Sequence, residues 1–364
     1  MESKIRSKFW GGLVLMKNVC FKRSLSLLAA VTAAACLLCS CGSDNKDEAA
    51  QSAQKAAETV TISCAGDCTL ASDESFSGNT FENVLKQNNG SYSYFFENVR
   101  DIFENDDITI VNLEGTLSKS GQRQDKTYAF RGDPDYVNIL KDGSVEAVTL
   151  ANNHSADYGS VSLSDTKDIL KENGIEYAMD METVHMNVRG IKVGIVGLYQ
   201  LDESADKIID AAMARMTEDD LVIVQIHWGV EKADSPEEEQ VALAHRAIDL
   251  GADLVIGHHP HVLQGVEKYK GKYICYSLGN FCFGGNPNPS DTDTMIFRQT
   301  FSFKEGMAAR DDNYSIIPCS ITSSRSSNNY QPTPLEGEER ERVEQKIIER
   351  SKKVGDGNLD LKFE

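Results

Sequence analysis

Side chains that commonly bind metal ions recur in short polar blocks between residues 67 and 261. The blocks contain Asp67; Asn112 and Glu114; Asn152, Asn153, His154 and Asp157; His227 and Glu231; His258, His259 and His261. Five of the seven histidines fall in these blocks, and only His185 and His245 lie elsewhere. Imidazole and carboxylate together suit Zn, Mn, Fe and similar divalent ions. One such residue is usually an ordinary hydrogen-bonded group, but the whole set predicts a metal site.

The histidine-rich run predicts two ligands that face the same side. His259 and His261 are separated only by Pro260. Alternate residues of an extended segment point in the same direction, and proline restricts the backbone between them.

Each polar block follows an apolar run of a kind typical of a buried strand. The runs are 59–63, 107–113, 145–150, 221–226 and 254–256. In α/β sheets, ligands bind beyond the carboxyl ends of the strands. We therefore expect these five strand ends to build one site.

The rest of the pattern alternates strands with helices. Further strands are predicted at 191–198, 273–278 and 295–303, and helices at 92–104, 134–140, 163–172, 205–216 and 236–250. This alternation predicts an α/β fold with much parallel pairing. The charged segment 336–353 predicts a terminal helix that faces solvent.

The composition excludes a protein that binds nucleic acid through its phosphates. The 364 residues contain 37 Lys+Arg and 56 Asp+Glu, a formal net charge of −19. Such a chain has no basic surplus with which to displace counterions from phosphates. A content of 40% hydrophobic and 26% charged residues is ordinary for a globular protein.

The N-terminus is similar to a lipoprotein signal peptide over residues 1–40. Residues 17–23 are basic and residues 25–38 are apolar, which is typical of a secretory signal and too short for a comfortable membrane span. Because Leu38-Cys39-Ser40-Cys41 resembles a bacterial lipobox, we expect Cys41 to be acylated and 41–58 to form a flexible tether. An uncleaved anchor or an ordinary signal is the alternative. The protein is thus expected outside the cytoplasm, lipid-anchored to the bacterial cell membrane.

The chain beyond the signal is more acidic than the whole. Residues 1–40 carry six basic and one acidic side chain, so the remainder, with 31 basic and 55 acidic, has a net charge of −24. Its cysteines beyond Cys41 are odd in number and show no Cys-x-x-Cys spacing: Cys64, Cys68, Cys275, Cys282 and Cys319. A thiolate zinc site is therefore not expected. We expect these cysteines to be small buried side chains instead.

Six blocks in order resemble the CapA family of poly-γ-glutamate capsule proteins, which belongs to the calcineurin-like metallophosphoesterases. They are GDCTL (66–70), NLEGTLS (112–118), ANNHSADYG (151–159), HWGVE (227–231), GHHPHVLQGVE (257–267) and YSLGNFCFGG (276–285). The resemblance implies a four-layer α/β/β/α sandwich of two mixed sheets over 59–330. A C-terminal charged helix and tail would follow at 331–364.

The resemblance also implies roles for individual residues. The implied metal ligands are Asp67, Glu114, Asn153, His227, His259 and His261, binding one or two divalent ions (Mn, Fe, Zn or Ca). His154 and Asp157 would be catalytic, and Asn112, Glu231, His258 and Asn280 would support the ligands or contact substrate. Two departures matter: Cys68-Thr69 follows Asp67 where the superfamily has a histidine two residues on, and Asn-Leu-Glu replaces an aspartate motif.

These observations favour a surface lipoprotein of the CapA type with a metal-dependent hydrolase or transferase site. The substrate could be a phosphoester, an ester or an amide, and poly-γ-glutamate itself contains no phosphate. The alternative is a non-catalytic component that binds or anchors an acidic polymer in a capsule export complex, and a third hypothesis is a ligand-binding lipoprotein. The expected partners are the membrane, capsule-synthesis or export proteins and an acidic polymer. The acidity of the chain makes direct binding of polyglutamate the less favoured hypothesis.

Overall fold

The computed structural model describes residues 58–304, 307–308 and 313–364, apart from residue 203. The predicted signal peptide, Cys41 and almost all of the tether lie outside this part of the chain. The described residues all belong to one compact unit. The division between 59–330 and 331–364 stays a prediction.

The larger of the two main sheets carries nine strands in the described residues. Its main path runs β17-β16-β14-β1-β2-β5-β6, with β13 also paired to β1 and β15 to β14. Their bounds are β1 (Glu58–Thr69), β2 (Ile108–Leu113), β5 (Ala147–Thr149), β6 (Glu176–Ala178), β13 (Asn280–Phe283), β14 (Asp293–Lys304), β15 (Met307–Ala308), β16 (Tyr314–Ser320) and β17 (Thr333–Pro334). The β1, β2, β5 and β6 strands are parallel, whereas β14 is antiparallel to β1.

The second main sheet has six strands in the described chain, in the order β11-β12-β10-β9-β8-β7. They are β7 (Val184–Val188), β8 (Ile191–Tyr199), β9 (Leu221–His227), β10 (Leu254–His258), β11 (Val266–Tyr269) and β12 (Lys272–Cys275). The β8, β9, β10 and β12 strands are parallel, and the two outer strands are antiparallel to their neighbours. A small parallel pair joins β3 (Thr116–Leu117) and β4 (Arg131–Gly132). Both main sheets are therefore mixed, as predicted.

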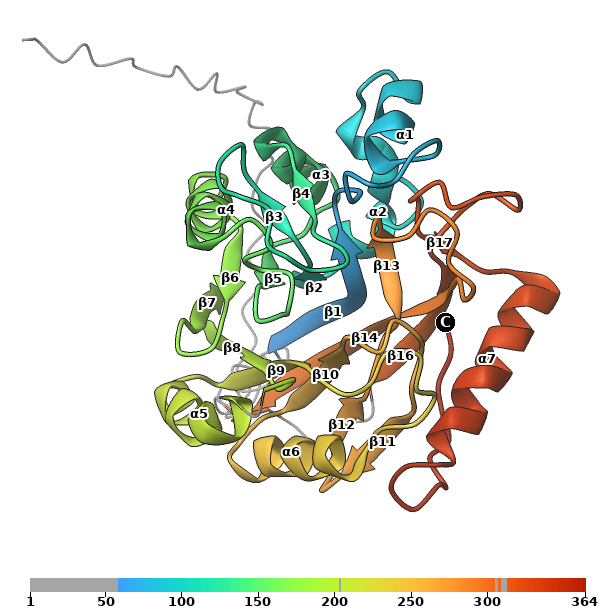
Figure 1. Cartoon of the computed structure of the whole chain (residues 1–364). Helices are drawn as coiled ribbons and strands as arrows, with labels where there is room; N and C mark the ends of the chain where they lie inside the picture. Colours follow the sequence, from blue (N-terminus) through green and yellow to red (C-terminus); the bar gives the residue numbers. More distant parts are fainter. Residues whose placement is uncertain (1–57, 203, 305–306, 309–312) are drawn as a thin grey trace, which may run out of the picture. The chain divides into compact units, whose positions relative to one another are not determined.

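Helices cover the outer faces of both sheets (Figure 1). The larger sheet packs against α1 (Phe81–Gln87), α2 (Arg100–Glu104), α3 (Val137–Asp142) and α4 (Ser160–Glu172), and the smaller one against α5 (Ser204–Met213) and α6 (Glu238–Asp249). Single 3-10 turns lie at Tyr92–Phe96, Pro134–Tyr136 and Ala214–Met216. One apolar cluster lies between the sheets and one lies under each helical layer. The predicted four-layer α/β/β/α sandwich is confirmed.

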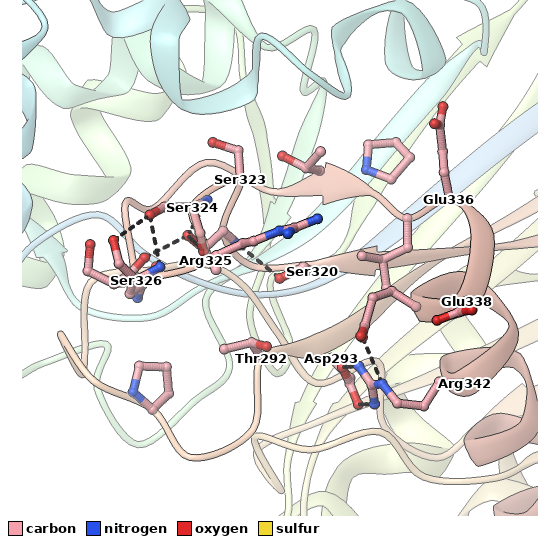
Figure 2. A pocket seen from close by; sticks show the side chains of 18 of the residues that line it. Thr292, Asp293, Ser320, Ser323, Ser324, Arg325, Ser326, Glu336, Glu338 and Arg342 are labelled. Atoms are coloured by element: carbon pink, nitrogen blue, oxygen red, sulfur yellow. Dashed lines mark hydrogen bonds and ion pairs between the residues drawn. The ribbon is translucent and has the colours of Figure 1, made fainter.

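A polar groove of about 1080 Å³ opens between the 322–328 loop, the start of β14 and α7 (Gly337–Ser351) (Figure 2). Its main charged pair is satisfied internally, because Arg342 donates to both oxygens of Asp293 at 2.7 and 2.6 Å. None of the residues predicted for the metal site lines this groove.

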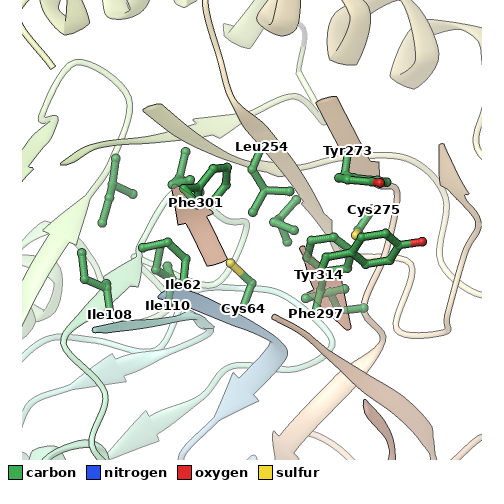
Figure 3. Packing of buried hydrophobic residues seen from close by; sticks show 14 of the residues in the cluster. Ile62, Cys64, Ile108, Ile110, Leu254, Tyr273, Cys275, Phe297, Phe301 and Tyr314 are labelled. Carbon is green, nitrogen blue, oxygen red and sulfur yellow. The ribbon is translucent and has the colours of Figure 1, made fainter. Parts of the chain in front are cut away.

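The inter-sheet core follows from the alternation of side chains along the strands (Figure 3). Along β1, every second side chain (Val60, Ile62 and Cys64) enters this core. Phe297 of β14 is fully buried there and stacks on Tyr314 at 5.4 Å between ring centroids. The five cysteines of the described chain are buried, as predicted, and they are free.

The predicted continuous helix at 92–104 is wrong. A 3-10 turn over Tyr92–Phe96 is followed by the separate helix α2. The break allows aromatic side chains to pack in different directions: Phe95 stacks on Phe81 at 4.3 Å, whereas Phe96 packs against Phe103 and Phe281 at about 6 Å. Tertiary packing therefore overrides the helical periodicity of the sequence.

The terminal helix is not simply a solvated one. Helix α7 buries Val343, Ile347 and Ser351, which lie four residues apart on one face, and the first two join the inter-sheet core. The prediction recognised the charged face and missed this narrow apolar one. Several short elements were also not predicted: α1, β6, β7, β11, β13 and β16.

No helix in the described part of the chain has the length and apolar character needed to cross a membrane.

Replacing Phe297 with alanine should lower the free energy of unfolding by about 3–5 kcal/mol, because it leaves a cavity between the two sheets. Urea denaturation followed by circular dichroism measures this change. The control is Val161→Ala, whose side chain is 48% exposed on α4 and should change stability by less than about 0.5 kcal/mol. Equal effects of the two substitutions would contradict the proposed core.

Candidate metal centre

The ends of β1, β2, β5, β9 and β10 deliver the predicted site residues to one place. Asp67 lies near the end of β1, directly opposite Asn112 of β2, and Glu114 follows β2. Asn153 and His154 follow β5. His227 ends β9 and pairs in register with His258, which ends β10. The five predicted strand ends therefore meet, although they come from two different sheets.

A close backbone approach fixes Asp67. Strand β1 continues through Asp67 rather than ending at Ser63, with a register shift between Cys64 and Asp67. The Asp67 N–H donates to the Gly279 carbonyl at 2.9 Å. A Cβ on Gly66 would lie 2.0 Å from that carbonyl oxygen, so only glycine permits the approach.

The Asp67 carboxylate is fully buried and contacts two imidazoles. Its Oδ1 accepts from Asn112 Nδ2 at 2.8 Å and lies 3.2 Å from His258 Nδ1. Its Oδ2 lies 3.2 Å from His261 Nδ1. Burial acts to raise the pKa of Asp67, but hydrogen bonds and charge from His258 and His261 hold it well below its ordinary value.

Glu114 shares this buried environment but has weaker partners. Thr69 Oγ1 donates to its Oε2 at 3.3 Å, and His227 Nε2 lies 3.7 Å from its Oε1. Burial, and then the charge of Asp67, raise the pKa of Glu114 to about 8. Because the two buried carboxylates lie side by side, the negative charge of Asp67 disfavours ionisation of Glu114.

His227 connects Glu114 to Asn153. Its Nε2 lies 2.9 Å from Asn153 Oδ1, and its ring centroid lies 4.7 Å from that of His259. Burial, and then the charge of His259, hold the pKa of His227 well below its ordinary value. Burial lowers the pKa of His259 to about 4, with His261 adding to the effect. Both rings are thus neutral at pH 7, the form that binds a metal.

His261 differs from these two histidines. Burial disfavours its charged form, but the charges of Glu114 and Asp67 raise its pKa to about 9. Asn280 contacts both the ring and the backbone of His261: its Oδ1 lies 2.9 Å from His261 Nδ1, and its Nδ2 donates to the His261 carbonyl at 3.2 Å. The predicted supporting role of Asn280 has this geometric basis.

His154 and Asp157 form a hydrogen-bonded pair next to Asn153. His154 Nδ1 lies 2.8 Å from Asp157 Oδ2, and the Phe130 N–H donates to the same oxygen at 2.7 Å. Lys126 Nζ donates to Asp157 Oδ1 at 2.7 Å and to the Asn153 carbonyl at 2.9 Å. Burial lowers the pKa of His154 despite Asp157. This arrangement fixes the imidazole ring and leaves Nε2 as the nitrogen that can meet a substrate.

Two residues of the site were not predicted. Gln225 Oε1 accepts a hydrogen bond from His258 Nε2 at 2.7 Å, so both nitrogens of His258 are used inside the protein. As the one polar residue in the apolar run 221–226, Gln225 did carry a recognisable signal. Lys126 lies in a loop far from any motif, and nothing in the sequence marked it.

Glu231 lies beside His259 and His261 on the solvent side of the centre. One carboxylate oxygen and one nitrogen from each ring lie within 4.8 Å of one another. A second group with the same spacing is formed by Asp67, Glu114 and His261. Asn112 links Asp67 to Asn152, whose Nδ2 donates to Asn112 Oδ1 at 3.0 Å. The predicted ligand roles of Asp67, Glu114, His259 and His261, and the predicted supporting roles of Asn112 and Glu231, stay predictions.

The residues present fit a divalent cation. His259 Nδ1 is buried and has no hydrogen-bond partner among the described residues. Asp67 and Glu114 are buried together, which is costly unless a cation neutralises them. Buried carboxylate and neutral imidazole donors suit a transition-metal ion or Zn, and their identities do not select one of these.

Both the family model and the curated proteins that match this sequence are described as capsule or PGA synthesis proteins. The family model described as "Bacterial capsule synthesis protein PGA_cap" matches residues 61–285. The capsule biosynthesis protein CapA of Bacillus anthracis is 32% identical over 220 residues, which is 52% of this chain and 54% of that protein. The PGA biosynthesis protein CapA of Bacillus subtilis (strain 168) is 32% identical over 213 residues, 52% of this chain and 56% of that protein. The chain thus spans about half the length of the curated relatives it matches.

Solved structures are similar at a lower level. A novel phosphatase from Mycoplasma pneumoniae aligns with a TM-score of 0.46 and 15% identity, covering 72% of this chain and 94% of that one. The NAD nucleotidase of Haemophilus influenzae aligns with a TM-score of 0.43 and 13% identity, covering 79% and 55%. Scores and identities at this level support no inference about chemistry.

Glu114 should make the metal-free chain less stable as the pH rises. The unfolded carboxyl loses its proton near pH 4.5, whereas the folded one keeps it up to about pH 8. The folded state binds more protons between these values, so this contribution to stability is present below pH 4.5 and lost as the pH rises through 8. Glu114→Gln should therefore lose less stability over this range. Urea titrations in a chelating buffer measure the difference, and parallel pH profiles for the two chains would contradict it.

Proposed function

The chain belongs to the family of bacterial capsule synthesis proteins designated PGA_cap, and from this premise we propose that it is a metal-dependent hydrolase or transferase of capsule-polymer synthesis or export. The observation that carries the proposal is the group formed by the buried carboxylates of Asp67 and Glu114 and the partly buried His261, whose donor atoms lie within 4.8 Å of one another. Burying ionisable side chains costs free energy, and such residues occur most often in sites that bind a ligand or carry out a reaction.

The cation would be held by Asp67, Glu114 and His261, with His227, Asn153 and His259 adjoining them. A divalent ion here supplies Lewis acidity, polarising the carbonyl or phosphoryl oxygen of a substrate. All six side chains come from strand ends or the turns after them, so the sheets hold them rigidly.

His154 is the residue placed to move a proton. Its Nδ1 is engaged by Asp157 at 2.8 Å, which leaves Nε2 to exchange a proton with the attacking or leaving group. Lys126 and the Phe130 N–H hold Asp157 in place. With its pKa lowered by burial, His154 enters the reaction neutral, and a proton taken from the nucleophile can then pass to the leaving group.

The substrate class follows from the polymer that this family's members are named for. A γ-linked glutamate chain offers amide carbonyls to polarise and free carboxylates to neutralise. Lys126, whose side chain is 28% exposed, is the cation next to the dyad that a substrate anion can approach. An amide, or an ester formed during transfer of the polymer, is therefore favoured over a phosphoester.

We further propose that acylation of Cys41 anchors the protein to the outer face of the cell membrane, where the growing polymer and its export proteins are the partners. The support is the signal-like sequence of residues 17–41 alone. A tether ahead of β1 would allow the domain to reach a polymer at the membrane surface.

Asp67→Asn should remove bound metal and turnover together, because the substitution takes a negative oxygen ligand from the centre. Elemental analysis and assays with phosphodiester, ester and γ-glutamyl amide substrates measure both. The matched variant is His154→Ala, which should keep the metal and lose about 10²–10⁴-fold in rate, as expected for a general acid or base. Full metal content and turnover in Asp67→Asn would refute the site. Metal binding without turnover on any substrate would favour the non-catalytic alternative.

Anchoring is tested by mass spectrometry of the protein extracted from bacterial membranes. The mature N-terminal residue should be Cys41 carrying an acyl modification, and Cys41→Ala should release the protein from the membrane fraction. A mature chain that starts elsewhere and carries no lipid would contradict the proposal.

A further inference from the structure

A tight turn after β9 places Glu231 against the histidine-rich segment. Gly229 has a φ of 80°, and a Cβ there would lie 2.5 Å from the Gln240 side chain, so the turn requires glycine. The Lys232 N–H donates to the Pro260 carbonyl at 2.7 Å. This hydrogen bond ties the turn to the residue between His259 and His261.

The Glu231 carboxylate has no partner that explains its position. Among the described residues, no hydrogen-bond donor or cation contacts it within ordinary bonding distance, although His259 and His261 lie close by. Its oxygen and the two ring nitrogens lie within 4.8 Å of one another. Three donor atoms within this spacing can surround one ion at metal–ligand distances of about 2.0–2.2 Å.

His259 provides an independent observation. The residue is only 6% exposed, and its Nδ1 has no hydrogen-bond partner in the described chain. A buried polar atom without a partner destabilises the folded state. A bound cation would satisfy this nitrogen.

The backbone of the same segment is also strained. His259 and His261 have φ values of 96° and 58°, in a region that residues with a Cβ adopt at a cost. Backbone strain of this kind is found most often at functional sites. The strained backbone of His259 and His261 therefore accompanies the placement of both rings beside Glu231.

We propose that Glu231 is a metal ligand, which binds a divalent cation together with His259 and His261. The inference rests on the proposed metal function and deepens it, since Glu231 was expected only to support the ligands or contact substrate. Two imidazoles and one carboxylate suit a borderline ion such as Zn²⁺, Mn²⁺ or Co²⁺. Glu231 is exposed, whereas Asp67 and Glu114 are buried, so it is also the ligand that an entering ion meets first.

His261 joins this group to the buried one. It belongs to both the Glu231 group and the Asp67–Glu114 group, and a neutral imidazole offers one lone pair to one ion. The two positions therefore adjoin and compete for His261. Removing Glu231 should weaken metal binding without emptying the buried position.

The test is calorimetric titration of the metal-stripped full chain with Co²⁺, with the visible Co²⁺ spectrum as a second readout of the ligand set. Glu231→Gln should weaken Co²⁺ binding by about 10- to 100-fold and change the visible Co²⁺ spectrum. Glu231→Asp keeps the charge and shortens the reach, so it should also alter the spectrum. The matched control is Glu238→Gln, which removes an equal charge from an exposed residue of α6 and should bind as the unaltered chain does.

A double variant separates a shared ion from two independent effects. If Glu231 and His259 bind the same cation, Glu231→Gln combined with His259→Ala should weaken binding by less than the product of the two single effects. An affinity and spectrum of Glu231→Gln equal to those of the unaltered chain would overturn the inference, as would multiplicative losses in the double variant.

The outcome is independent of catalysis. Weakened Co²⁺ binding in Glu231→Gln, together with no turnover by the unaltered chain on any substrate, would uphold this ligand and refute the proposed hydrolase. Unchanged Co²⁺ binding in Glu231→Gln, together with metal-dependent turnover, would refute the ligand and uphold the hydrolase.

Discussion

The burial of two neighbouring carboxylates, Asp67 and Glu114, is the constraint on which the rest of the site depends. One of them can remain charged only because imidazoles contact it, and the other is pushed towards its neutral form. Hydrogen bonds from Asn112 and Thr69 satisfy the remaining oxygens in part. A divalent cation would remove the conflict, since it favours the ionised form of both groups. The apo arrangement is thus one that metal binding stabilises.

Both sheets contribute side chains to the site around these carboxylates. The larger sheet supplies the carboxylates and Asn153, whereas the smaller sheet supplies His227 and the 258–261 segment. The apolar core between the sheets fixes how far apart these two sets lie. Close backbone contacts set the final positions: a Cβ on Gly66 would meet the Gly279 carbonyl, and one on Gly257 would meet the Tyr276 carbonyl, each at 2.0 Å. The positions of the proposed ligands, which come from two sheets, therefore depend on dense packing several residues away.

In the described structure, some polar residues of the site serve to position other site residues. His258 has both ring nitrogens engaged by Asp67 and Gln225, so its contacts orient the carboxylate. Asp157 is engaged by three donors and orients His154. Lys126 connects this dyad to the Asn153 backbone. In the proposed site these residues would act through their neighbours, which are the groups proposed to contact the ion or the substrate.

Residue types and spacing alone determined that the chain is an α/β protein with a metal-binding inventory at its strand ends, because apolar runs followed by His, Asp and Asn blocks are local features. They also determined the alternation that builds the inter-sheet core. They did not determine that Lys126 meets Asp157, that helix 92–104 breaks, or that α7 buries Val343 and Ile347, since each depends on partners distant in sequence. Only the tertiary structure places Glu231 beside His259 and His261, which distinguishes it from other exposed glutamates. The Lys232–Pro260 hydrogen bond joins two turns that are 28 residues apart, and no local pattern carries that contact.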